Sequence, residues 1–190
     1  MSSFNSYTYE LDLSVWRELF LSKGSPMRFR KGEIFVRHGK RLRYCGFVLS
    51  GTFKYTIADS NGNIHVVGFV FSDDLLGDFM SIIRQSPAKT NIVAATDAEV
   101  MVCDISVVRT MLDNKPDLRN KMTENLFCQA YELFLEQHVK SSKDRYVALL
   151  KRCPDILQNI SLKEMASYLN ITPTHLSRIR RELTFTFSKK

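Results

Sequence analysis

The stretch Leu162–Leu183 reads LKEMASYLNITPTHLSRIRREL, and it carries the signals of two short helices joined by a tight turn. Ser161, followed three residues later by Glu164, forms a capping box that predicts the start of the first helix. Asn170 stands where that helix must end in a left-handed conformation, which asparagine tolerates. The pair Thr172-Pro173 then predicts the start of the second helix, as its N-cap and first helical residue.

The apolar residues of both predicted helices recur at helical spacing, so each helix has one face to bury. We expect the first helix to bury Leu162, Met165, Ala166 and Leu169, and the second to bury Leu176, Ile179 and Leu183. The small Ala166 lies where the second helix would cross closely. The pattern as a whole predicts a helix-turn-helix.

The second helix leaves a polar and basic face outside this core. Its members are Thr172, Thr174, His175, Ser177, Arg178 and Arg181. A recognition helix in the major groove aims such side chains at bases and phosphates, and Arg178 is placed to bridge two acceptors of guanine. Residues 140–190 hold eleven Lys and Arg against four Asp and Glu, whereas residues 1–139 hold sixteen of each. The charge therefore favours double-stranded DNA as the partner of this region, against the alternative of a solvated basic helix pair.

The preceding sequence changes period at about Ile105. From Pro26 to Cys103, short β-branched and aromatic runs are separated by glycines, and Asn61-Gly62 lies between two runs as a hairpin turn. This pattern is typical of a β-roll or barrel. After it the spacing predicts a short helix, Ser106–Leu112, and a long one that begins near Pro116 and has no further Pro or Gly up to His138.

The long helix carries two adjacent apolar stripes, of which one can cover the β-domain and the other needs a second partner. We predict that the stripe Met122, Leu126, Ala130 and Leu133 contacts a parallel copy of itself in a homodimer. The neighbouring stripe consists of Phe127, Tyr131 and Phe134. The alternative is that both stripes belong to the core of one chain.

These observations predict an α+β protein in three parts: a β-roll domain with flanking short helices (1–115), a dimerisation helix (116–140) and an all-α helix-turn-helix domain (141–190). No apolar run approaches the roughly 18 residues of a membrane helix, and the N-terminus lacks the basic start and apolar core of a secretion signal. The four cysteines form no CxxC motif, which argues against a spaced metal site and favours reduced thiols in the cytoplasm.

The order of these parts resembles the catabolite activator/FNR (CRP/FNR) superfamily of bacterial transcription regulators over about residues 15–183. The most specific stretches are Lys31-Gly32-Glu33, Val48–Gly51, Asp74–Asp78 and Ala166–Leu183. The resemblance implies a double-stranded β-helix, or jelly roll, of the cyclic nucleotide-binding type. It also implies a homodimer that reads a near-palindromic operator, control by a small effector, and RNA polymerase as a candidate partner. No enzymatic activity is expected.

The effector region departs from the members of that superfamily that bind cyclic AMP. Those members have Gly-Glu and, ten residues after the Glu, Arg-Ser; here Gly77-Asp78 is followed at that distance by Ala88, then Lys89 and Thr90. The positions that would offer hydroxyls to adenine align with Leu133 and Phe134. Losing a bidentate arginine and two hydroxyls costs on the order of several kcal/mol, so cyclic AMP is disfavoured and no cofactor is assigned. A more hydrophobic effector and a filled core without a ligand both stay open.

Two alternatives to a DNA-binding regulator follow from the sequence. After Leu183 only seven residues remain, enough for one short strand, so the β-hairpin wing that the superfamily places there is truncated or absent. Lys189 and Lys190 would still supply phosphate contacts. One alternative is therefore a sensor or adaptor of the same fold that has lost specific DNA binding. The other is a cupin-like enzyme, which the scattered histidines disfavour because none forms an HxH pair.

Overall fold

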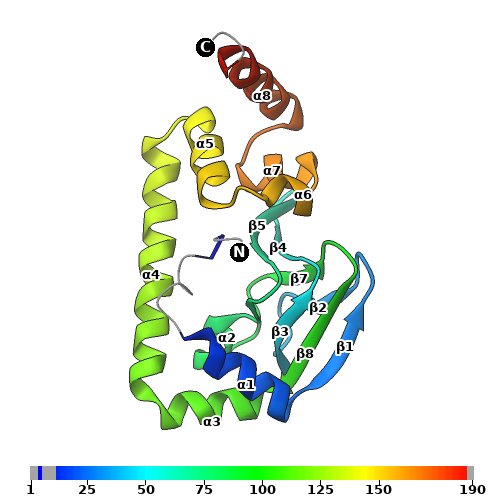
Figure 1. The fold of residues 1–190 in the computed structure, drawn as a ribbon, viewed down its shortest axis with the longest axis vertical. Coiled ribbons are helices and arrows are strands. Elements are labelled where there is room, and N and C mark those ends of the chain that lie inside the picture. The colour runs from blue at the N-terminus through cyan, green and yellow to red at the C-terminus, as the bar shows by residue number, and fades with distance from the viewer. Residues whose placement is uncertain (1–3, 6–11, 188–190) are drawn as a thin grey trace.

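The structure is a computed structural model that describes residues 4–5 and 12–187 of the 190-residue chain. Figure 1 shows a β-domain flanked by the long helix α4 (Pro116–Val139), with a group of shorter helices beyond one end of the sheets. The expected α+β architecture is confirmed. The shorter helices are α5 (Ser142–Arg152), α6 (Ile156–Asn159), α7 (Leu162–Tyr168) and α8 (Pro173–Phe187).

Two four-stranded antiparallel sheets form the β-domain. One has the order β1 (Ser25–Phe29), β8 (Ala98–Asp104), β3 (Tyr44–Ser50) and β6 (Leu75–Leu76); the other has the order β2 (Ile34–Val36), β7 (Asn91–Ala94), β4 (Phe53–Ala58) and β5 (Ile64–Val70). Three helices flank the sheets: α1 (Leu13–Lys23), α2 (Phe79–Arg84) and α3 (Ile105–Asn114). The core between the sheets is aromatic and branched, with Phe47, Phe53, Ile92 and Val100 fully buried.

The hairpin expected at Asn61-Gly62 joins β4 to β5. The Asp59 carboxylate accepts hydrogen bonds from the backbone N–H groups of Asn61 and Asn63, at 2.8 and 2.9 Å, which closes the turn. Gly62 has φ +82°, a left-handed conformation that glycine adopts without strain. A further hydrogen bond from Asn63 Nδ2 at 3.0 Å, the ring nitrogen of His65 at 3.1 Å and these two backbone hydrogen bonds hold the pKa of Asp59 well below its ordinary value.

Strand β5 lies at the edge of its sheet and faces two cores at once. Its pairing with β4 shifts register at Val67, because Thr56 opposes Val66 while Tyr55 opposes Gly68. Such a bulge re-aims the side chains on either side of it. Val66 and Phe69 therefore point to the same outer face although they are three residues apart, and both are buried there among the C-terminal helices.

Most of the α4 stripe predicted to face a second copy is instead turned toward the chain's own core, and only its Ala130 is exposed. Met122 is 3% exposed and belongs to the core of the β-domain, so it is not open to a partner; Leu126 and Leu133 are half-buried on the inward side. The stripe open to solvent is Phe127, Tyr131 and Phe134, at 67%, 52% and 56% exposure. Periodicity located both stripes, but the contacts of the β-domain decide which one is covered. We call the open set the outer stripe.

The C-terminal helices share one core with the outer face of β5. Figure 1 places these helices beyond the β4–β5 end of the β-domain. The backbone N–H of Val66 donates to Ser167 Oγ at 2.9 Å, and Lys54 Nζ on β4 pairs with Glu164 Oε1 at 2.7 Å. The ring of Phe4 packs edge-on against Phe69, with 5.6 Å between ring centroids, and lies 5.3 Å from the ring of Tyr168. Helix α7 is therefore docked on β5 by apolar, hydrogen-bonded and ionic contacts together.

The chain after Leu183 differs from the expectation of a short strand. Helix α8 continues through Phe187, so residues 184–187 are helical, and Thr184 Oγ1 donates to the carbonyl of Arg180 as an exposed helical residue does. Lys189 and Lys190 lie outside the described residues. Within the described chain, no strand follows the last helix.

Enlarging Ala166 tests the packing on which the docked helices depend. Ala166 lies on α7 and is fully buried. Ala166→Leu should lower the free energy of unfolding by about 1–3 kcal/mol, because overpacking forces backbone shifts. Lys163→Leu, at an exposed position of the same helix, should change it by less than about 0.5 kcal/mol. Chemical denaturation of both variants measures the difference; equal stability would show that α8 does not cross closely at this residue.

Candidate nucleic-acid interface

The two helices α7 and α8 begin where the sequence predicts, and the turn between them lies at the predicted residues. Ser161 Oγ accepts from the backbone N–H of Glu164 at 3.2 Å, and Glu164 Oε2 accepts from the backbone N–H of Ser161 at 2.9 Å, which completes the capping box. Asn170 has φ +55° and turns the chain between the helices. Thr172 Oγ1 then accepts from the backbone N–H of His175 at 3.1 Å as the N-cap of α8. Local hydrogen bonds therefore fix the turn.

The core of this pair holds α8 in one orientation. Met165, Ala166 and Leu176 are fully buried, and Ile179 and Leu169 nearly so. The predicted buried faces are confirmed, with Leu162 and Leu183 packed partly buried at the margin. Arg145 on α5 adds a polar tie, because its Nη2 donates to the Leu169 carbonyl at 3.1 Å, at the end of α7.

The predicted outward face of α8 is exposed. Its six members are Thr172, Thr174, His175, Ser177, Arg178 and Arg181. Within the described chain, neither Arg178 nor Arg181 has an ion pair, while the nearby carboxylate of Glu182 lies 3.5 Å from Lys143 Nζ. The two guanidinium groups are thus available, with their positive charge uncompensated, on one side of a capped helix. Such a surface can donate to phosphates and to the acceptor edge of guanine.

Three of the six predicted effector residues come together at the start of α2. Asp78 is the N-cap of this helix: its Oδ1 accepts from the backbone N–H of Ser81 at 3.1 Å, and its Oδ2 accepts from the backbone N–H of Lys89 at 3.0 Å. Tyr55 Oη donates to the carbonyl of Gly77 at 2.8 Å. Both oxygens of the Asp78 carboxylate are therefore used by backbone N–H groups of the chain itself.

The other three predicted effector residues do not complete one pocket with these. Thr90 follows Lys89 and is half-buried, whereas Leu133 lines a separate cleft of about 640 Å³ between β5, α4, α5 and α7. Phe134 lies on the outer stripe, where its ring centroid is 4.5 Å from that of His138. Leu133 and Phe134 are consecutive on a helix and so point to different sides of it.

Sequence reasoning missed a buried carboxyl group next to this region. Asn5 Nδ2 donates to Asp74 Oδ2 at 2.6 Å and to the carbonyl of Phe69 at 3.1 Å, while the backbone N–H of Leu75 donates to Asp74 Oδ1 at 2.7 Å. Burial raises the pKa of Asp74 to about 6, against the opposing effect of these hydrogen bonds. No local signal could reveal the pair, since Asn5 and Asp74 are 69 positions apart.

Comparison with known proteins agrees with this architecture. Residues 26–115 match the family model of the cyclic nucleotide-binding domain. Among solved structures, the chain is similar to FixK2 from Bradyrhizobium japonicum, with 18% sequence identity, a TM-score of 0.74, and coverage of 86% of this chain and 85% of that one. It is also similar to the catabolite activator protein of Thermus thermophilus, with 18% identity, a TM-score of 0.57, and coverage of 95% and 87%.

A mutant of CooA from Carboxydothermus hydrogenoformans gives a TM-score of 0.67 at 13% identity, over 98% of this chain and 85% of that one. No curated protein sequence matches the chain. The segment 26–115 is thus similar to the cyclic nucleotide-binding domain, over slightly less than half of the chain. Over nearly its whole length it has the fold of the catabolite activator/FNR superfamily, and the resemblance stated from the sequence is confirmed at that level.

None of the helices that the structure describes is long and apolar enough to cross a membrane. Over residues 4–5 and 12–187, no group of three or more His, Cys, Asp or Glu side chains is arranged to hold a metal ion.

The pKa of Asp74 predicts a pH dependence of stability. Because its folded-state pKa of about 6 lies above the ordinary 3.8, the folded protein holds this proton more tightly than the unfolded chain. The free energy of unfolding should therefore fall as the pH rises from about 4 to about 6, by a few kcal/mol at most, and Asp74→Asn should remove that slope. Denaturation midpoints between pH 4 and 7.5 measure it. Asp73→Asn, at the exposed neighbouring carboxylate, should keep the wild-type slope; an unchanged slope in Asp74→Asn would contradict the assignment.

Proposed function

We propose that this protein is a sequence-specific DNA-binding transcription regulator of the catabolite activator/FNR type. It acts as a homodimer that reads a near-palindromic operator in the cytoplasm, under the control of a small effector other than cyclic AMP. It is not an enzyme, and RNA polymerase is a candidate partner. The observation that carries the proposal is the exposed, unpaired face of α8, with Arg178 and Arg181, on a helix-turn-helix whose core and caps are complete.

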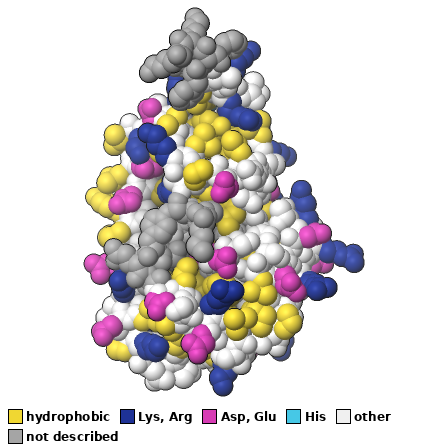
Figure 2. Space-filling model, in the orientation of Figure 1, with side chains coloured by type: hydrophobic (Ala, Val, Ile, Leu, Met, Phe, Trp, Pro, Cys, Tyr) yellow, Lys and Arg dark blue, Asp and Glu magenta, His cyan; other side chains and the backbone are white. Residues whose placement is uncertain are grey.

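The outer stripe of α4 supports the homodimer. Phe127, Tyr131, Phe134 and His138 are spaced by four, three and four residues, which is the spacing of a coiled-coil seam. The rings of Phe127 and Tyr131 are stacked 6.0 Å apart on the surface, and Figure 2 shows hydrophobic side chains along the outer edge of α4. A second parallel copy would remove these rings from water and present two α8 helices to one face of a duplex.

The start of α2 supports an effector other than cyclic AMP. Ala88 stands at the distance from Asp78 where a member that binds cyclic AMP has an arginine for the phosphate, so that cation is missing. Asp78 itself is used as a helix cap and as the acceptor of the Lys89 backbone N–H. An effector of this domain has to bind elsewhere or carry no phosphate at this place.

Selection from random duplex DNA by the purified protein tests the proposal directly. Without added ligand and at moderate salt, we expect enrichment of a two-fold symmetric site with half-sites about 10 base pairs apart. Enrichment of a single asymmetric half-site would contradict the homodimer. Salt-sensitive binding without any enriched sequence would instead favour the alternative of a sensor or adaptor that has lost specific reading.

Arg178 should contribute both affinity and base preference. Arg178→Ala should weaken binding to the selected site by about 5- to 150-fold, the equivalent of 1–3 kcal/mol, and relax selectivity at one base pair of each half-site. Arg84→Ala removes the same charge from the C-terminal turn of α2, away from α8, and should change binding by less than threefold. Fluorescence anisotropy with matched and single-mismatch duplexes measures both. Weakening that is equal for all duplexes would place Arg178 on a phosphate and contradict its role in base reading.

The outer stripe should control the oligomeric state. Tyr131→Glu combined with Phe134→Glu would place two carboxylates in an apolar seam and should shift the protein to a monomer, because a buried unpaired charge is strongly unfavourable. Ile64→Glu combined with Leu157→Glu adds the same charge at two exposed apolar residues outside α4 and should leave the dimer intact. Sedimentation equilibrium distinguishes the outcomes; a dimer that survives in the first variant would exclude α4 as the interface.

A further inference from the structure

A second basic surface lies on the β-domain, far along the chain from α8. Residues 28–43 read RFRKGEIFVRHGKRLR and contain seven Lys and Arg but one acidic residue. Figure 2 shows Lys and Arg side chains gathered along the edge of the β-domain away from α4. The charge is not visible in the balance of residues 1–139, because acidic residues elsewhere in that range cancel it.

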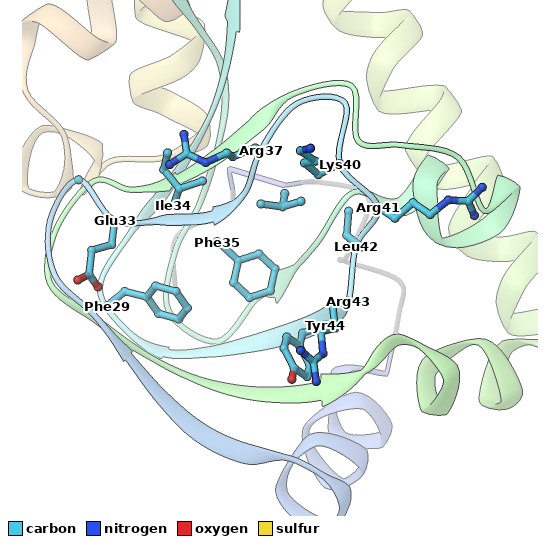
Figure 3. Close-up of a pocket in the computed structure, with 12 residues that line it drawn as sticks. Phe29, Glu33, Ile34, Phe35, Arg37, Lys40, Arg41, Leu42, Arg43 and Tyr44 are labelled. Carbon is cyan, nitrogen blue, oxygen red and sulfur yellow. The ribbon is translucent and has the colours of Figure 1, made fainter.

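This segment encloses a pocket of about 650 Å³, within the size range of small-molecule sites. Figure 3 shows the rings of Phe29 and Phe35 between β2 and the returning chain, with Arg37 and Lys40 along one side and Arg43 along the other. Phe35 is half-buried, and its ring packs 5.8 Å from that of Phe29 and 6.2 Å from that of Phe53. The floor is thus aromatic and held rigidly by the core.

Two of the four cationic side chains of the pocket contact other groups of the chain, and the other two form no ion pair among the described residues. Arg41 Nη1 donates to the carbonyl of Gln85 at 3.0 Å, and Arg43 is held over the ring of Tyr44 at 5.1 Å. Arg37 and Lys40 are exposed and have no ion pair among the residues that the structure describes. The one carboxylate in the lining, Glu33, accepts from the backbone N–H of Arg30 at 2.8 Å. Free positive charge therefore stands beside an aromatic floor, without an acidic partner to neutralise it.

We propose that this pocket, which we call the basic pocket, binds a small organic anion that has an aromatic or similarly flat apolar body and a phosphate or carboxylate group. The body would lie on Phe35 and Phe29, and the anionic group would be held by Arg37 and Lys40, while the charge of Arg43 on the other side of the pocket adds to the attraction. None of the residues predicted for the effector site lines this pocket. Its concave shape favours a small ligand over a duplex or an acidic protein surface, which would need no aromatic floor. The inference stands whether or not α8 binds DNA.

Fluorine NMR titration of the full chain tests this with 4-fluorophenyl phosphate as the probe. We expect binding with a dissociation constant of about 1 mM or tighter, and at least tenfold weaker binding of neutral 4-fluorobenzyl alcohol and of inorganic phosphate in competition. The combined variant Arg37→Gln, Lys40→Gln and Arg43→Gln should weaken probe binding at least tenfold. Phe35→Leu should weaken it by a smaller factor, because it keeps the core filled but removes the flat ring.

The matched control is the combined variant Arg28→Gln, Arg30→Gln and Lys31→Gln, which removes the same charge from the same segment outside the lining. It should weaken probe binding by less than threefold. The proposal would be overturned if the two triple variants lost the same affinity for the probe, or if inorganic phosphate bound as tightly as the probe. In either case charge alone would explain the binding, and a macromolecular anion would fit as well. Absence of saturable binding by the wild-type chain would also overturn it.

Discussion

The position of the C-terminal helices relative to the β-domain depends on the outer face of β5. This strand lies at the edge of its sheet, where its backbone groups and apolar side chains would otherwise face water, and α7 covers it. Val66 and Phe69 can both contribute only because of the register shift at Val67. Since the same helix packs α8, the orientation of the candidate DNA-reading face is set by the β-domain. A change inside the roll that moved β5 would move that face with it.

The candidate effector region shows how a family framework is kept while its ligand chemistry changes. The turn into α2 is present, but the carboxylate of Asp78 and the hydroxyl of Tyr55 are already satisfied by the chain's own backbone. Four cationic groups of the β-domain, Arg37, Lys40, Arg41 and Arg43, line the basic pocket between β2 and β3. A domain can therefore be similar to the cyclic nucleotide-binding domain in fold while its charged groups are placed differently.

Helices α7 and α8 could be predicted almost residue by residue up to Leu183, because the capping box, Asn170 and the N-cap Thr172 act on neighbouring backbone groups. The stripes of α4 could be located but not assigned, since burial of Met122 depends on contacts with the β-domain. The docking of α7 could not be predicted at all: Val66 and Ser167 are 101 positions apart and neither carries a distinctive pattern. The basic pocket could not be predicted from the net charge, because the seven Lys and Arg of residues 28–43 are balanced by acidic residues elsewhere in 1–139. Short elements such as β6 and α6 are too brief for periodicity to detect.

The aromatic contact between Phe4 and Tyr168 has a consequence for the order of folding during synthesis. Its two partners are 164 positions apart, so Phe4 can make this contact only after Tyr168 has been synthesised. The β-domain can pair its strands long before that, with Phe69 and the edge of β5 still uncovered. For that interval the nascent chain presents an apolar sheet edge, which is a site for pairing with a neighbouring chain. Once α7 is complete it covers this edge. A helix that is synthesised after the β-domain thus protects an edge of that domain.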